Sequence, residues 1–181
     1  MNDSMIERSA KLLLKYHECS REYILQLTGS ERWMLPIINP VEVMCHGDFA
    51  PYNVTIIDNN PIGIIDFDTL HPGPVLWDIA YAIYRWIPFN GPQNPDHYYD
   101  LEEQIRKAKL FFDSYGLEIN KRAEFPLVLI KRLQSLVDFM LKEAECGNED
   151  FKLNIKEGHL QAYLHDIQYI KNNAERIKNE L

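Results

Sequence analysis

Apolar residues recur near helical spacing at the start of the chain. Between residues 3 and 17 they form such a pattern, and Asn2 to Ser4 offers capping side chains in front of it. A second, shorter helical pattern covers residues 21–27 and ends at Thr28-Gly29-Ser30, where turn-forming residues follow one another. The pattern therefore predicts a helix over residues 3–17 and a short helix over residues 21–27.

Two short apolar runs further along are typical of β-strands. Residues 54–57 and 62–65 flank Asp58-Asn59-Asn60-Pro61, a cluster of turn-forming residues. The pattern predicts two strands joined by a turn. Antiparallel pairing would bring Asn53, just before the first run, beside Asp66, just after the second.

One more short strand is predicted at residues 41–44, and it leads directly into His46-Gly47-Asp48. The segment after Asp68 is rich in Pro and Gly and predicts a loop. Pro74 then suits the first turn of a helix over residues 75–86, whose apolar positions lie on one side and predict burial.

The remainder of the chain has a helical pattern. Residues 88–96 hold three prolines and a glycine, which predicts a surface loop. Three helices are predicted after it, over residues 98–115, 122–145 and 151–178, the first stopped by Gly116 and the second by Gly147. The expected fold class is α+β and mostly α-helical, a helical body around one small sheet.

Length and composition favour one domain over residues 1–181, because 46% hydrophobic residues is ample for a core. Within it we distinguish a helical lead-in (1–40), a loop and hairpin (41–68) and a helical body (74–181). The formal charge is −8 and no run of basic residues exists, which argues against nucleic acid as a partner. A negative surface mildly favours a cationic small molecule, although solubility is the more ordinary explanation.

The three cysteines are far apart and lack CxxC spacing, so neither a disulfide framework nor a structural zinc site is expected. A reducing, cytoplasmic location fits this best. The first residues do not resemble a secretory signal, and nowhere do about 18 apolar residues follow one another. We therefore expect a chain that is neither exported nor inserted in a membrane.

Three polar residues around the predicted hairpin are candidates for chemistry. Asp48 alone could be a turn former or a helix cap, Asn53 alone a loop residue, and Asp66 alone the end of a strand. Their joint spacing, with a hairpin between them, favours a site in which Asn53 and Asp66 share one cation.

The residues HGDFAPYN followed by IIDFD closely resemble the HGDxxxxN catalytic loop and the IDF metal-binding segment of the aminoglycoside phosphotransferase family, relatives of protein kinases and choline kinases. PGPVLWDIAYA and LLLKYHE resemble the helices that support and precede this loop. The likeness covers about residues 11–86. It implies a protein-kinase-like C-terminal lobe whose small β-hairpin carries the catalytic and metal-binding loops.

The resemblance implies roles for single residues. Asp48 matches the catalytic base, and Asn53 and Asp66 match the ligands of Mg²⁺, a cation that prefers hard oxygen donors. His46, Asn53 and Asp66 are assigned to cofactor binding, with ATP as co-substrate. His46 would also shape the loop together with Gly47, where a Cβ would be forbidden.

Asp78 matches a family residue that holds the catalytic loop by hydrogen bonds, and a favourable interaction with the helix dipole is the other explanation for an acid there. An aromatic group in the same helix could line a substrate cleft and attract a cation, but core packing is the default interpretation. The group consists of Trp77, Tyr81, Tyr84 and Trp86.

The chain differs from the family in what precedes the catalytic loop. No GxGxxG is possible, because no two glycines are closer than ten residues, and no VAIK-like strand is found. The chain therefore looks like the C-terminal lobe alone. We expect weak nucleotide binding and an exposed apolar face that a second copy or a partner chain would cover.

Three hypotheses follow. The first is a phosphotransferase that moves the ATP γ-phosphate to a hydroxyl of an aminoglycoside-like or amino-alcohol substrate. The second is a catalytically impaired lobe that acts as a binding or regulatory module. The third is a truncated homologue.

Overall fold

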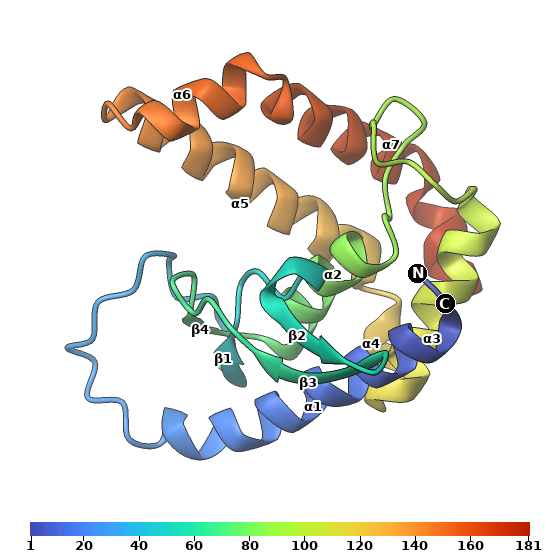
Figure 1. Ribbon diagram of the computed structural model, residues 1–181, viewed down its shortest axis with the longest axis horizontal. Helices are drawn as coiled ribbons and strands as arrows, with labels where there is room; N and C mark the ends of the chain where they lie inside the picture. The colour runs from blue at the N-terminus through green and yellow to red at the C-terminus, as the bar shows by residue number, and fades with distance from the viewer.

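The computed structural model describes residues 1–181 and contains seven α-helices and two small antiparallel sheets of two strands each. In Figure 1 the helix α1 lies along one side of the sheets, while α5, α6 and α7 form an arm on the other side. The prediction of a mostly helical α+β chain is confirmed, but the one small sheet that was expected is two separate sheets.

Helix α1 (Asp3–Ile24) is one continuous helix, so the prediction of two helices over residues 3–17 and 21–27 was wrong. Its N-terminus is capped by Asn2, whose side chain accepts the amide of Met5 at 2.9 Å. The buried face continues through His17 and Ser20. Because these two buried residues are polar, the apolar pattern stopped before the helix did.

The first sheet pairs β1 (Val43–Cys45) with β4 (His71–Gly73). The prediction of a strand at residues 41–44 was nearly right, but β4 was predicted as a loop because of its Pro and Gly content. A two-stranded sheet consists of edges only, and a proline is tolerated there because one side of each strand needs no ladder donor. The second sheet is the hairpin of β2 (Val54–Ile57) and β3 (Asn60–Ile64).

The hairpin was correctly predicted, but its turn is shorter than expected. Only Asp58 and Asn59 connect the strands, and both have positive φ, of 50° and 57°. Positive φ at both central residues is the signature of a type I′ turn, which Asp and Asn tolerate. The register shifts between Thr55 and Ile56, a bulge that lets the two strands of unequal length pair.

Helix α2 (Val75–Trp86) follows Pro74 as predicted, and every residue in it except Arg85 is buried. Helix α3 (Leu101–Tyr115) begins three residues later than predicted and ends, as predicted, at Gly116 with φ 82°. The aromatic residues of α2 belong to the hydrophobic core, which confirms the default interpretation for that group.

The C-terminal part has more helices than predicted. A short α4 (Ile119–Arg122) precedes α5 (Phe125–Glu145), where one helix was expected. Likewise α6 (Glu149–Lys156) and α7 (His159–Glu180) replace a single helix over 151–178. The predicted helix is interrupted at Gly158, whose φ of 93° lies in the left-handed region.

A cluster of buried side chains joins α1, α2, α3, α5 and α7 to the sheets. Helix α5 packs against α2 and α7, and α1 packs against α3 and β1. None of the helices has both the length and the apolar character needed to cross a membrane. All three cysteines are free thiols.

Candidate active site

The loop between β1 and β2 and the segment after β3 lie next to each other. The carbonyl of Asn53 accepts the amide of Ile65 at 3.0 Å, which extends the hairpin ladder by one step beyond the Val54–Ile64 pair. Asp66 is the next residue along the chain. The backbone register therefore brings the start of β2 and the residue just before Asp66 together at the open end of the hairpin.

Asp66 has two unusual features. Its φ is 62°, in the left-handed region that few non-glycine residues adopt. Its exposed carboxylate has no hydrogen-bond or ion-pair partner within the chain. Non-glycine residues with left-handed backbone cluster at functional sites, where the surrounding structure holds them in place.

Asn53 is 5% exposed, and its side-chain nitrogen donates both to the Asp48 carbonyl at 3.0 Å and to Asp48 Oδ2 at 2.9 Å. These bonds orient the amide, and its oxygen remains without a donor. No group of three or more His, Cys, Asp or Glu side chains could hold a metal ion. The oxygen donors of Asn53 and Asp66 suit Mg²⁺, which takes one or two protein ligands and retains water.

The Asp48 carboxylate is half-buried and has two side-chain donors. Tyr52 donates its hydroxyl to Oδ1 at 2.8 Å, and Asn53 donates to Oδ2. Burial raises the pKa of Asp48, and the hydrogen bond from Tyr52 and the positive charges of Arg85 and Arg132 offset this rise only in part. A raised pKa makes the carboxylate a better proton acceptor at neutral pH.

His46 and Gly47 shape the loop, as predicted. The His46 ring is fully buried; Nδ1 accepts the amide of Asp48 at 3.2 Å, so Nε2 donates to the Ile65 carbonyl at 3.0 Å. Gly47 has φ 82°, and a Cβ there would lie 2.6 Å from the Thr69 carbonyl oxygen. Because both ring nitrogens of His46 are used inside the chain, its assignment to cofactor binding stays a prediction.

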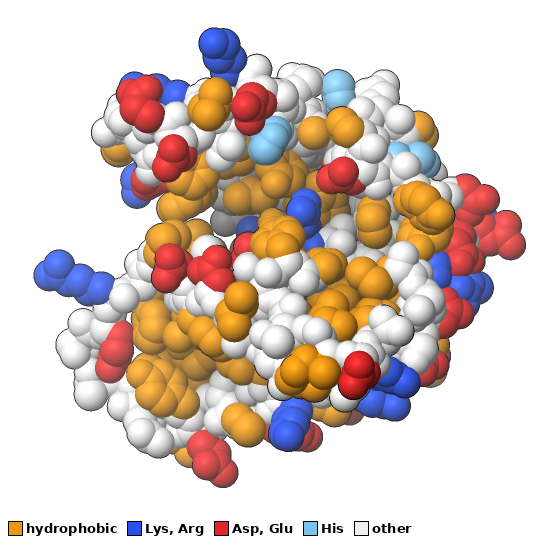
Figure 2. Space-filling view, viewed as in Figure 1, with side chains coloured by type: hydrophobic (Ala, Val, Ile, Leu, Met, Phe, Trp, Pro, Cys, Tyr) orange, Lys and Arg blue, Asp and Glu red, His pale blue; other side chains and the backbone are white.

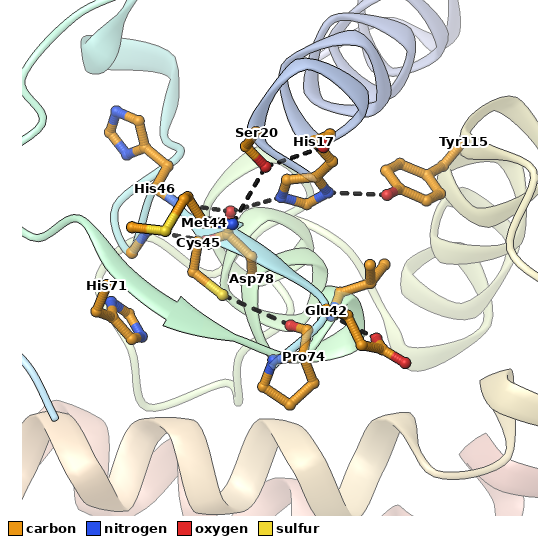
Figure 3. Close-up of polar contacts among 12 residues, drawn as sticks. His17, Ser20, Glu42, Met44, Cys45, His46, His71, Pro74, Asp78 and Tyr115 are labelled. Carbon is orange, nitrogen blue, oxygen red and sulfur yellow. Dashed lines mark hydrogen bonds and ion pairs between the residues drawn. The ribbon is translucent and has the colours of Figure 1, made fainter. Parts of the chain in front are cut away.

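Asp78 of helix α2 holds this loop through hydrogen bonds, and Figure 3 shows its surroundings. Its carboxylate accepts the amides of His46 at 2.8 Å and Gly47 at 2.9 Å, together with His17 Nε2 at 3.0 Å. The predicted role of Asp78 as support for the loop is confirmed. Burial alone would raise the pKa of Asp78, but His17 and the Gly47 amide lower it to about 2.

Sequence reasoning missed the role of His17. Its side chain is fully buried, and Nδ1 makes a hydrogen bond of 2.8 Å to the Tyr115 hydroxyl. Helix α1, helix α3 and the catalytic loop are thereby linked through Asp78. A polar side chain on the buried face of a helix was the signal that could have identified it.

Two further side chains hold the loop carbonyls. Arg132 of α5 donates Nη2 to the Gly47 carbonyl at 2.6 Å and lies 4.4 Å over the Tyr81 ring. Trp86 donates its indole nitrogen to the Phe49 carbonyl at 3.1 Å. The role of Arg132 could not be predicted, because one arginine among the basic residues of a helix has no distinctive spacing.

A family model described as "Phosphotransferase enzyme family" matches residues 3–109. The chain belongs to this family. The match covers α1, both sheets, α2 and part of α3, and hence every residue predicted for the site; α4 to α7 lie outside it. No curated protein and no solved structure matches the chain.

Membership in the phosphotransferase family confirms the resemblance seen in the HGD and IDF segments. The mostly helical architecture with two small antiparallel sheets agrees with a kinase-like fold. At the family level the chain is therefore a kinase-like phosphotransferase. The predicted site residues are united by one loop and one hairpin, and their individual roles remain predictions.

Proposed function

We propose that the protein transfers the γ-phosphate of ATP to a hydroxyl group of a small molecule. Asp48 acts as the base, and Asn53 and Asp66 hold Mg²⁺. The observation that carries this proposal is the Asp48 carboxylate: it is half-buried, oriented by Tyr52 and Asn53, and has a raised pKa. The aminoglycoside-like or amino-alcohol class of acceptor rests on resemblance and on the net charge of −8 alone.

In this mechanism Asp48 orients the acceptor hydroxyl and takes its proton. The acceptor oxygen forms a bond to the γ-phosphorus, the bond to the β–γ bridging oxygen breaks, and ADP leaves. Tyr52 and Asn53 fix the carboxylate, and Asp78 fixes the loop that carries it. Positioning of this kind supplies much of the rate in phosphoryl transfer.

The residues present fit a magnesium ion. The Asn53 amide oxygen has no donor, and the Asp66 carboxylate is exposed and unpaired. When bound, Mg²⁺ would neutralise negative charge on the phosphate oxygens. The left-handed backbone of Asp66 is then explained as strain retained at a functional position.

Phosphorus-31 NMR of the full chain with Mg-ATP and a panel of hydroxyl compounds tests this proposal. We expect a new phosphate-ester signal that is lost in Asp48→Asn and Asp66→Asn. Asp58→Asn is the matched control, because Asp58 lies in the turn at the other end of the hairpin and has the same charge. Unchanged transfer in Asp48→Asn would remove the proposed base.

A second candidate function is a binding or regulatory module, and one observation favours it. Figure 2 shows hydrophobic side chains over the hairpin, and the exposed ones come from both strands and from the segment after β3. They are Ile56, Ile57, Ile62, Ile65 and Phe67, each 41–54% exposed. Exposed apolar side chains gathered on one hairpin are a feature of interaction sites in soluble proteins.

Light scattering of the full chain over a range of concentrations tests the second candidate. It predicts a dimer or a hetero-complex that Ile57→Lys weakens and Asp48→Asn leaves intact. A monomeric chain that transfers phosphate in the presence of Mg-ATP would rule this candidate out.

A further inference from the structure

Arg85 is the only residue of α2 that is not buried. Its guanidinium makes no hydrogen bond and no ion pair, and its Nε is a buried nitrogen without a partner. Other poorly exposed arginines have partners for their guanidinium: Arg122 pairs with Asp113 at 2.6 Å, and Arg132 donates Nη2 to the Gly47 carbonyl, although the Nε of Arg132 is also buried without a partner. Partial burial of a charge without a partner costs stability, so a group outside the chain is a natural partner for Arg85.

Aromatic rings hold the Arg85 guanidinium in place. Its central carbon lies 5.3 Å from the centre of the Tyr52 ring and 6.0 Å from that of Tyr84. Such cation–π contacts orient an arginine without neutralising it. Arg85 is therefore a fixed cation whose hydrogen-bond donors are free.

The same ring connects Arg85 to the proposed base. The hydroxyl of Tyr52 donates to Asp48 at 2.8 Å while its ring lies against Arg85. The guanidinium and the catalytic carboxylate are thus separated by about one phenol ring. An acceptor of a few carbon atoms could present a hydroxyl to Asp48 and another group to Arg85.

Arg85 lines the walls of two neighbouring cavities, one formed with Met1 and the loop over residues 88–99 and one beside α7. The cavity beside α7 also has potential hydrogen-bond donors in its wall, from His159, Gln161, Tyr163 and His165. Its two acids are exposed: Asp96, and Glu157, which lies 4.0 Å from His159. Figure 2 shows Lys or Arg atoms at the inner end of the notch between the helical arm and the sheets.

We propose that the acceptor hydroxyl compound carries an oxyanion, a carboxylate or a phosphate, which pairs with Arg85 while its hydroxyl meets Asp48. This inference rests on the proposed function and names its substrate class. The planar guanidinium matches an oxyanion in a bidentate way. At short range a fixed local cation outweighs the net charge of −8, most of which is distant and screened.

Isothermal titration of the full chain without nucleotide tests the anion site. The probes are glycerate, glycerol 3-phosphate and choline, which are small hydroxyl compounds with a carboxylate, a phosphate and a quaternary ammonium. We expect at least one of the two anions to bind, with an affinity that Arg85→Gln lowers about 10-fold to 100-fold. Whichever anion binds more tightly identifies the oxyanion.

Two variants control for lost charge and lost packing. Arg176→Gln removes a positive charge from an exposed site on α7 that pairs only with Glu180, and we expect less than about a twofold change in affinity. Arg85→Lys keeps the charge but loses the planar fork, and we expect an intermediate affinity. Circular dichroism of each variant checks that the fold is intact.

The inference is overturned if neither anion binds. It is overturned too if the Arg85→Gln and Arg176→Gln variants bind the preferred anion with equal affinity. It is also overturned if choline binds more tightly than both anions. Phosphate transfer measured in parallel separates this from the proposed function. Transfer to choline that needs Asp48 but not Arg85 would support the function and refute the anion site, whereas Arg85-dependent binding without transfer would refute the function alone.

Discussion

The carboxylates on the two sides of the catalytic loop differ in their hydrogen bonds and in the direction of their pKa shift. Asp78, on the inner side, is fully buried, has three donors, and has a pKa of about 2. Asp48, on the outer side, has two neutral donors, and burial raises its pKa. The difference indicates that the charged carboxylate of Asp78 holds the loop, whereas the carboxylate of Asp48 can accept a proton.

The largest expected effect is on catalysis at Asp48. Replacing Asp48 by Asn removes the proton acceptor but keeps the hydrogen bond with Tyr52, so kcat should fall by about 10²-fold to 10⁴-fold. The free energy of unfolding should stay about equal, because the loss of the Asn53 hydrogen bond to Oδ2 offsets the removal of an ionised carboxylate from a desolvated position. Steady-state kinetics and urea denaturation measure both, and a variant that loses activity because it unfolds would contradict the comparison.

The next largest effect is on stability at Asp78. Asp78→Ala leaves His17 and two loop amides buried without an acceptor, which should lower the free energy of unfolding by about 3–5 kcal/mol. Asp138→Ala, at an exposed site on α5, should change it by less than about 0.5 kcal/mol. A cost at Asp78 as small as that at Asp138 would mean that the network does not hold the loop.

Comparing Gly47 with Gly116 distinguishes the effect of a steric contact in the loop from the effect of a left-handed backbone angle. Both have φ 82°, but a Cβ would meet the Thr69 carbonyl at Gly47 and nothing within 4 Å at Gly116. Gly116→Ala should cost about 1 kcal/mol, and Gly47→Ala about 1–3 kcal/mol more. Equal costs in thermal denaturation would show that the loop can move away from Thr69.

The smallest expected effect is the pH dependence of stability. Because the pKa of Asp78 is lower in the folded state, its stabilisation is present above about pH 4 and is lost as the pH falls toward 2. Asp48 contributes to the pH dependence with the opposite sign. Because its pKa is raised in the folded state, its ionised form destabilises the fold, and this destabilisation disappears as the pH falls. The stability difference between wild type and Asp78→Asn should therefore shrink below pH 4 in urea titrations. A difference that grows there would contradict the assigned direction.

The sequence was sufficient where apolar spacing and special residues agree. Helix α2 was predicted with its exact limits, because Pro74 and a continuous apolar face mark it. Helix α1 was divided wrongly, because the buried His17 and Ser20 looked like surface residues. Strand β4 was missed because Pro72 indicates a loop unless its partner strand is known.

The site could be predicted only as far as motif residues go. The resemblance of the HGD and IDF segments pointed to Asp48, Asn53 and Asp66, and the resemblance of the following helix assigned Asp78 its supporting role. The role proposed for Arg85 could not be predicted, because a single arginine in a helix indicates an ordinary solvent-facing charge. Its contact with the Tyr52 ring and its place in a cavity beside helix α7 arise only in the fold.

Carbon-13 NMR titration of the aspartate carboxyl groups, assigned with Asp48→Asn and Asp78→Asn, tests the contrast between the two carboxylates most directly. The account predicts that Asp48 titrates above the ordinary value of about 3.9 and that Asp78 titrates near 2. The reverse order, or two ordinary values, would contradict the assignment of one acid to catalysis and the other to structure.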